Sequence, residues 1–250
     1  LNNGFNPSST LTGSNVITLP DTVTELTNYA NQKCNGQDAV TLQTAFALSC
    51  NTAFVEMSEQ LGADELRKYA KAFGVGENYD LGVSTSAGTL GDLPDGAATA
   101  QSAIGQRDVT MTALQAAVMA GTVANKGTRM QPYLVNRITD AQMKDVRTTK
   151  PKKADQAVNE ETAATLTDLM YASERSSWGY DGNGFASKTG TAEHGEGLAP
   201  HVWYVAFDPE RDIAVGVVVK NGGNLGESAT GGKVSGPIGR AILRAYQGEQ

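Results

Sequence analysis

Histidine and cysteine occur only twice each in this chain of 250 residues. His194 and His201 lie far along the sequence from Cys34 and Cys50. A structural zinc site needs about four such ligands, usually in closely spaced pairs. We therefore predict no metal site, and no sequence feature calls for a cofactor.

Long apolar runs are also missing. No segment approaches the roughly 18 apolar residues that cross a membrane, and the opening LNNGFNPSST has neither the basic start nor the apolar core of a signal peptide. The chain begins with Leu1 instead of Met, so we expect further residues to precede it in the natural protein.

Positive charge is scarce as well. The 20 basic residues face 27 acidic ones, which gives a net charge of -7, whereas phosphate binding needs a basic face. We interpret the short basic run at 150–153 as a solvated linker. The composition therefore predicts no nucleic-acid partner.

The two cysteines leave two alternatives open. Cys34 and Cys50 are bridged if the protein is secreted, or they are two buried free thiols. A bridge across a loop of this length would stabilise the fold by about 3 kcal/mol in the chain-entropy model.

Apolar periodicity predicts mainly helices before residue 180. The predicted helices cover 41–48, 52–62, 64–73, 112–127 and a segment that begins at Asn159. Residues 75–108 are rich in Gly, Ser, Thr, Asp and Pro and are interpreted as a long irregular excursion. A peripheral hairpin is expected from 130–138 and 144–149.

The last third is predicted to contain consecutive strands and a final helix. The strands cover 184–193, 201–208 and 212–222, and the tight connection at 209–211 makes the last two antiparallel. Helices, then antiparallel strands, then a covering helix predict an α+β domain over 1–250, an antiparallel sheet flanked by helices.

Several common catalytic motifs are absent from the sequence. It has no H-E-x-x-H, G-x-S-x-G or G-x-G-x-x-G. GESATGGK at 226–233 fails as a phosphate loop because Val234 follows its Lys. His194 has no neighbour that would mark it as a general base.

Two polar clusters remain as candidates. Ser49-Cys50-Asn51 lies at the predicted helix junction, where a hydroxyl can pass a proton and an amide can donate and accept. Lys188-Thr189-Gly190 lies on a predicted strand, where Lys and Thr can hold a carboxylate and Gly lets a ligand approach the backbone. Alone, the first cluster also suits a helix cap, and the second occurs often by chance.

Together the clusters form S-x-N and K-T-G, two motifs of penicillin-binding proteins and β-lactamases, in the expected order. The stretches SCNTAF, SAIGQRDVTMTALQAAVMAGTVANKGTRMQPYLV and SKTGTAEH agree. From about residue 15 the chain resembles the transpeptidase domain of class B penicillin-binding proteins, in particular the actinobacterial penicillin-binding protein A type. The resemblance implies the α+β fold shared with serine β-lactamases and a D,D-transpeptidase that cross-links peptidoglycan.

The resemblance also implies roles for the first cluster and for the lysine. Ser49 would relay a proton, and Asn51 would hold the substrate amide. Lys188 would supply positive charge, which disfavours a second cation nearby. Independently of the resemblance, we hypothesise that a disulfide between Cys34 and Cys50 would pin the Ser49 loop.

The remaining motif residues would bind the substrate, a stem peptide that ends in D-Ala-D-Ala, or a β-lactam antibiotic. Thr189 and Thr191 would hold the terminal carboxylate, and Gly190 would leave room for the ligand. The backbone N–H of Thr191 would donate to the oxyanion.

The nucleophile of the family lies in S-x-x-K, and no Ser of this chain is followed three residues later by Lys. The resemblance places that motif upstream of Leu1 on a core helix, so we expect these residues alone to form no acyl-enzyme. It also implies a location on the outer face of the cell membrane and division or elongation proteins as partners. The alternatives are a β-lactamase, a D,D-carboxypeptidase, or a non-catalytic module that senses peptidoglycan or β-lactams.

Overall fold

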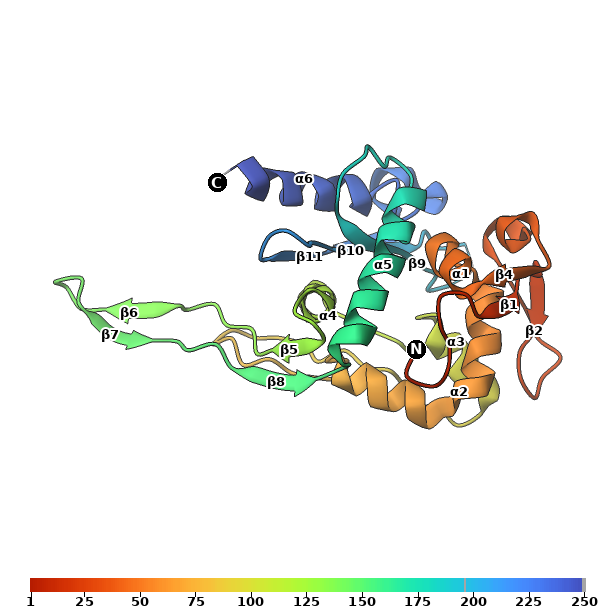
Figure 1. Cartoon of the computed structure of the whole chain (residues 1–250), viewed down its shortest axis with the longest axis horizontal. Helices are drawn as coiled ribbons and strands as arrows, with labels where there is room; N and C mark the ends of the chain where they lie inside the picture. Colours follow the sequence, from red (N-terminus) through yellow and green to blue (C-terminus); the bar gives the residue numbers. More distant parts are fainter. Residues whose placement is uncertain (196, 249–250) are drawn as a thin grey trace.

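The computed structural model describes residues 1–195 and 197–248. Its centre is a three-stranded antiparallel sheet in the order β11-β10-β9 (Figure 1). The strands are β9 (Ala186–Ala192), β10 (His201–Asp208) and β11 (Ile213–Val219). All three predicted strands are thus confirmed, and the one that carries Lys188 lies at an end of this sheet.

Helices cover both faces of the sheet, because alternate residues of β10 point to opposite sides. On one side Tyr204 packs with Leu243 of the C-terminal helix α6 (Ser235–Gly248). On the other side Phe207 packs with Ala120 of α4 (Ala113–Ala124) and Met170 of α5 (Glu160–Ser176). Figure 1 shows α6 on one side of the sheet and α4 and α5 on the other. The predicted α+β architecture is confirmed.

A glycine allows α4 to lie directly on the sheet. A Cβ built on Gly216 of β11 would lie 2.4 Å from the carbonyl oxygen of Ala113 and 2.7 Å from the amide nitrogen of Ala117. No side chain fits at such distances, so the close contact between helix and strand depends on glycine at this position.

The helices α1 (Leu42–Leu48) and α2 (Asn51–Ala72) are consecutive along the chain. α1 begins at the Thr41 cap, and α2 follows after two residues. The sequence predicts a helix end at Gly62 and a new helix from residue 64. The structure confirms this break: Gly62 has φ +76° and ψ +172°, which is not helical, so α2 consists of two helical segments joined at a kink. Glycine interrupts the helical geometry here because it adopts positive φ without steric cost.

The interpretation of 75–108 as wholly irregular is wrong. It contains α3 (Gly96–Ala103), whose Asp95 cap accepts a hydrogen bond from the amide of Ala98 at 2.7 Å. Alanine has the highest helix propensity, and α3 packs against α2. These local contacts outweigh the Gly- and Pro-rich surroundings.

Short strands complete the fold. The pairs are β1 (Thr10–Thr12) with β4 (Ala39–Thr41), β2 (Val16–Thr18) with β3 (Glu25–Thr27), β5 (Thr128–Met130) with β8 (Lys153–Gln156), and β6 (Arg137–Thr139) with β7 (Asp145–Thr148). The predicted peripheral hairpin therefore exists, with shorter strands and a second pair at its base. Figure 1 shows it as a long arm that extends away from the rest of the chain. In the described part of the chain, no helix combines the length and apolarity needed to cross a membrane.

Candidate active site

Ser49 lies at the junction between α1 and α2 in an unusual backbone conformation. Its φ of +57° and ψ of +49° place it in the left-handed region. For a residue with a Cβ this conformation costs about 1–2 kcal/mol, and it persists only where the surroundings enforce it. The chain therefore turns sharply at Ser49, between two helices.

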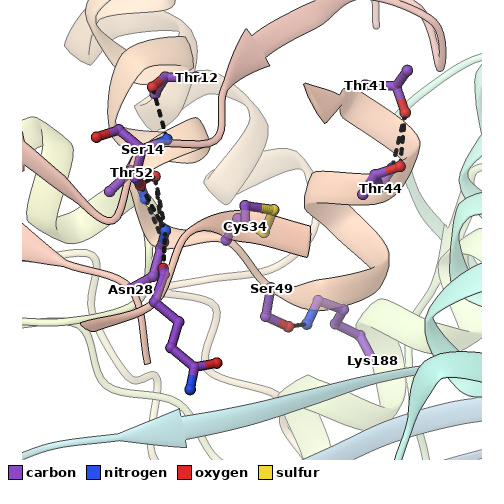
Figure 2. Close-up of a disulfide and its surroundings, with 11 residues drawn as sticks. Thr12, Ser14, Asn28, Cys34, Thr41, Thr44, Ser49, Thr52 and Lys188 are labelled. Atoms are coloured by element: carbon purple, nitrogen blue, oxygen red, sulfur yellow. Dashed lines mark hydrogen bonds between the residues drawn. A yellow bond between two sulfur atoms is a disulfide. The ribbon is translucent and has the colours of Figure 1, made fainter. Parts of the chain in front are cut away.

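The surroundings that enforce this turn include a disulfide. Cys50, the residue that precedes α2, is bonded to Cys34 (Figure 2). Both cysteines are 4% exposed and belong to a core cluster with Leu11, Val40 and other apolar residues. The residue next to Ser49 is thus fixed both covalently and by packing.

The side chain of Ser49 meets Lys188. The ammonium of Lys188 donates a hydrogen bond to Ser49 Oγ, although the two residues lie 139 positions apart (Figure 2). The ammonium also donates to the carbonyl of Thr189 at 3.0 Å and lies 5.7 Å from the ring centre of Phe46. The S-x-N and K-T-G clusters are therefore neighbours in space.

Burial changes the acidity of this lysine. It lowers the pKa of Lys188 from 10.5 to about 8, because a desolvated ammonium is less stable than a solvated one. Near neutral pH the side chain is charged, but it loses its proton more readily than a surface lysine.

Asn51, the third residue of S-x-N, begins α2 and is partly exposed. Its Nδ2 donates to the carbonyl of Thr27 in β3 at 3.0 Å. This bond orients the amide, so one of its donors is already engaged by the protein.

Thr189, Gly190 and Thr191 follow Lys188 along β9. Gly190 pairs with Trp203 of β10, and Thr191 is the most exposed of the three. The Thr191 hydroxyl oxygen accepts a hydrogen bond from the amide of Gly231 at 3.4 Å. Its hydroxyl hydrogen is therefore free to donate to another group.

Gln106 is a neighbour of the site that the sequence analysis did not single out. It lies between α3 and α4, and its Nε2 donates to the backbone carbonyl of Thr191 at 3.4 Å. Gln106 is part of the stretch SAIGQRDVT, which carried the family resemblance without a role for any single residue.

An apolar cavity is lined in part by Phe54, whose ring centre lies 6.4 Å from that of Phe46. Its volume is about 240 Å³. Its lining includes Leu1, Phe54, Met57, Leu61, Leu66 and Leu166. It thus lies between α2 and α5, next to the first residues of the chain.

The histidines form a pair of their own. The rings of His194 and His201 stack with centres 4.0 Å apart, and His194 Nε2 lies 2.9 Å from the carbonyl oxygen of Ala199. Across residues 1–195 and 197–248, no group of three or more His, Cys, Asp or Glu is arranged to hold a metal ion.

Comparison with known proteins gives consistent matches. The model of the penicillin-binding protein transpeptidase domain matches residues 1–244. The chain is 43% identical over 251 residues to the peptidoglycan D,D-transpeptidase PbpA of Mycolicibacterium smegmatis, and the aligned region covers 97% of this chain and 51% of that protein. It is 40% identical over 256 residues to the peptidoglycan D,D-transpeptidase PbpA of Mycobacterium tuberculosis, and this aligned region covers 98% of this chain and 52% of that protein.

Solved structures agree. Penicillin-binding protein A from M. tuberculosis as a ceftriaxone acyl-enzyme complex has a TM-score of 0.92 at 40% identity, over 97% of this chain and 56% of that chain. Its penicillin G acyl-enzyme complex has a TM-score of 0.91 at 40% identity, over 98% and 57%. The chain spans about half the length of the curated relatives it matches. On its fold, its motifs and these matches, the chain belongs to the penicillin-binding protein transpeptidase family.

Proposed function

We propose that this chain forms most of the transpeptidase domain of a peptidoglycan D,D-transpeptidase that β-lactams acylate. The observation that carries the proposal is the hydrogen bond from the Lys188 ammonium to Ser49 Oγ, which joins the two motifs at one site. The names of the relatives support the same activity.

The site residues suit a proton relay. In the first step, the upstream Ser would attack the carbonyl carbon of the penultimate D-Ala and pass its proton to the lysine of its own S-x-x-K motif, and the peptide C–N bond would break. That lysine would then return the proton to Ser49 once Ser49 has given up its own. The departing D-Ala nitrogen needs a proton. Because Ser49 Oγ accepts a hydrogen bond from Lys188, its own hydroxyl hydrogen is free to donate to that nitrogen. In the second step an amine of another stem peptide would attack the acyl-enzyme, lose a proton along the same route and release the serine.

β9 would hold the substrate. The hydroxyls of Thr189 and Thr191 and the charge of Lys188 would bind the terminal carboxylate, while the Thr191 N–H would stabilise the oxyanion. Gly190 would let the peptide lie against the strand, and Asn51 would hold its amide. A β-lactam, which resembles the D-Ala-D-Ala end, would occupy the same positions.

The nucleophile is proposed to lie upstream of Leu1, on a helix whose apolar side chains fill the apolar cavity of about 240 Å³. The cavity is lined by Leu1 itself and by Phe54, whose partner ring Phe46 lies beside the Lys188 ammonium. A helix in this place would bury its apolar face and lie close to the Ser49 hydroxyl. An anchor further upstream would hold the domain on the outer face of the cell membrane. Division or elongation proteins are proposed partners on the family resemblance alone.

The test uses the full-length gene product with penicillin and reads intact mass over time. We expect a covalent adduct, and Ser49→Ala should slow acylation by about a hundredfold, as the loss of a proton relay does. Ser176→Ala is the matched control, because that hydroxyl at the end of α5 bonds only to the local Ala172 carbonyl, at 3.0 Å, and lies outside the site.

Three outcomes would contradict the proposal. They are the absence of an adduct, unchanged acylation in Ser49→Ala, and rapid hydrolysis of the penicillin, which would indicate a β-lactamase. Analysis of the peptide products distinguishes the remaining alternative, a D,D-carboxypeptidase. A carboxypeptidase transfers the acyl group to water, whereas a transpeptidase transfers it to an amine.

A further inference from the structure

A buried carboxylate lies behind β9 and has no part in the chemistry above. Glu174, near the end of α5, is 0% exposed. Its Oε1 accepts hydrogen bonds from Arg240 Nε at 2.6 Å and Asn183 Nδ2 at 2.9 Å. Its Oε2 accepts from Tyr204 Oη at 3.0 Å and from the hydroxyl of Ser187. Four donors therefore converge on one side chain.

This carboxylate is held as an anion. Burial alone would raise the pKa of Glu174, but the hydrogen bonds from Arg240, Ser187 and Asn183 outweigh burial and lower it. If any one donor were displaced, the negative charge of Glu174, which water cannot reach, would be less well stabilised. The network therefore fixes its members relative to one another. They belong to α5, the connection between α5 and β9, β9, β10 and α6.

Ser187 connects this network to the site. It is fully buried and directly precedes Lys188 in β9. Because successive side chains of a strand point to opposite faces, Ser187 reaches Glu174 while Lys188 reaches Ser49. The backbone between the two is thus held from both sides.

The position of β9 makes this attachment important. Among the described strands, β9 pairs only with β10. One ladder of backbone hydrogen bonds leaves the other edge of a strand without a neighbouring strand, and on β9 the Gln106 side chain bonds there only to the Thr191 carbonyl, at the far end of the motif. The bond from Ser187 to Glu174 supplies a second attachment at the start of the Lys188-to-Thr191 segment.

We propose that Glu174, acting through Ser187, is a positioning residue that holds β9 where the Lys188 ammonium meets Ser49. The proposal rests on the function proposed above and adds a residue pair outside the S-x-N and K-T-G motifs. If the Ser187 hydroxyl is lost, β9 can shift. The ammonium then leaves Ser49 and gains water, which slows the proton relay.

The experiment compares Ser187→Thr with Ser187→Val in the full-length protein. The two replacements have the same shape, and only Thr keeps the hydroxyl. The acylation rate with a fluorescent penicillin is measured across pH, together with Tm. We expect Val to acylate at least about tenfold more slowly than Thr, a change that corresponds to about 1.4 kcal/mol in the barrier. Thr should stay within about threefold of the wild type.

The pH profile separates positioning from general destabilisation. Within the described residues, the groups in contact with the Lys188 ammonium are the Ser49 hydroxyl, the Thr189 carbonyl and the Phe46 ring, and none of these carries a charge. If Lys188 acts as a cation, activity falls as the pH rises through its pKa. Solvation of a displaced lysine raises that pKa, so the alkaline limb should move to higher pH in Val and stay in place in Thr. A loss of stability alone would lower the rate without moving the limb.

Controls keep the outcomes distinct. Thr122→Val removes a buried hydroxyl that bonds only within α4, to the Val118 carbonyl at 2.7 Å, and should leave both rate and profile unchanged. Ser187→Ala replaces Val if Val does not fold. Equal rates and profiles in the Thr variant and the hydroxyl-free variant, with a wild type that is acylated, would overturn this inference alone. A wild type that is not acylated would overturn the proposed function, and this inference with it.

Discussion

Loss of the disulfide between Cys34 and Cys50 is expected to weaken both the fold and the site. The bridge closes a loop with a sequence separation of 16. Restricting a loop of that length in the unfolded chain stabilises the folded state by about 3 kcal/mol. In addition, replacing each buried cysteine by alanine removes a sulfur atom from the core, which costs roughly 1 kcal/mol of burial free energy at each site.

These terms predict that Cys34→Ala/Cys50→Ala lowers the free energy of unfolding by about 5 kcal/mol, at the upper end of the range for native disulfides. For a domain of this size the corresponding fall in Tm is roughly 10–20 °C. Reduction of the wild type, which keeps both sulfurs, should give about three fifths of that fall, since only the loop term is lost.

The same change is expected to reduce activity beyond the loss of folded protein. Ser49 holds a left-handed backbone next to Cys50, and without the bridge it can relax to a conformation that turns its hydroxyl away from Lys188. Acylation by penicillin in the full-length protein, measured well below the Tm of the variant, should therefore slow by about tenfold.

Calorimetry of the oxidised, reduced and double-alanine proteins gives the three Tm values, and intact mass verifies the bridge. A double-alanine Tm within about 2 °C of the oxidised wild type would refute the loop argument. An unchanged acylation rate would show that the neighbouring core residues hold Ser49 without the bridge.

Two further predictions concern stability. Lys188→Met should raise Tm at pH 7, because below pH 8 the folded wild type carries a desolvated ammonium. The gain in Tm should shrink between pH 8 and 10.5, where the wild-type lysine is neutral when folded and charged when unfolded. Equal gains in Tm at pH 7 and pH 10.5 would count against a desolvated cation. Gly216→Ala should lower the free energy of unfolding by about 1–3 kcal/mol in chemical denaturation, since its Cβ would lie 2.4 Å from the Ala113 carbonyl oxygen, whereas Gly184→Ala, whose Cβ meets nothing within 4 Å, should not.

The sheet and its covering helices were predictable because their signals are local. β10 and β11 are β-branched and aromatic runs joined by a tight turn, and α4 has apolar residues at helical spacing. α3 was not found, because its helix propensity comes from small residues without an amphipathic pattern in a Gly-rich setting.

The pairing of Ser49 with Lys188 was predictable only through the family resemblance. No local rule joins residues 139 positions apart. The left-handed backbone of Ser49 was not foreseen either, since the sequence marked only a break between helices. Such conformations are imposed by tertiary contacts, here the disulfide and the core around it.

Glu174 was missed, although the sequence held a signal. Leu166, Met170 and Glu174 lie four residues apart along α5, so the carboxylate lies in line with an apolar stripe. A charged residue in such a stripe indicates a buried partner. The partner itself, Arg240 on α6, is not evident without the fold, because it lies 66 positions away.

The arrangement of the site explains why its support lies outside the motifs. A left-handed serine and a desolvated ammonium both cost stability, and neither would persist on flexible elements. In each case the adjacent residue is fixed. Cys50, next to Ser49, forms a disulfide, and Ser187, next to Lys188, donates a hydrogen bond to the buried carboxylate of Glu174. Cys50, at the start of α2, and Ser187, in β9, thus hold the two partners of the hydrogen bond between Lys188 and Ser49 in place. The strength of that bond should therefore depend as much on Cys50 and Ser187 as on the two residues that form it.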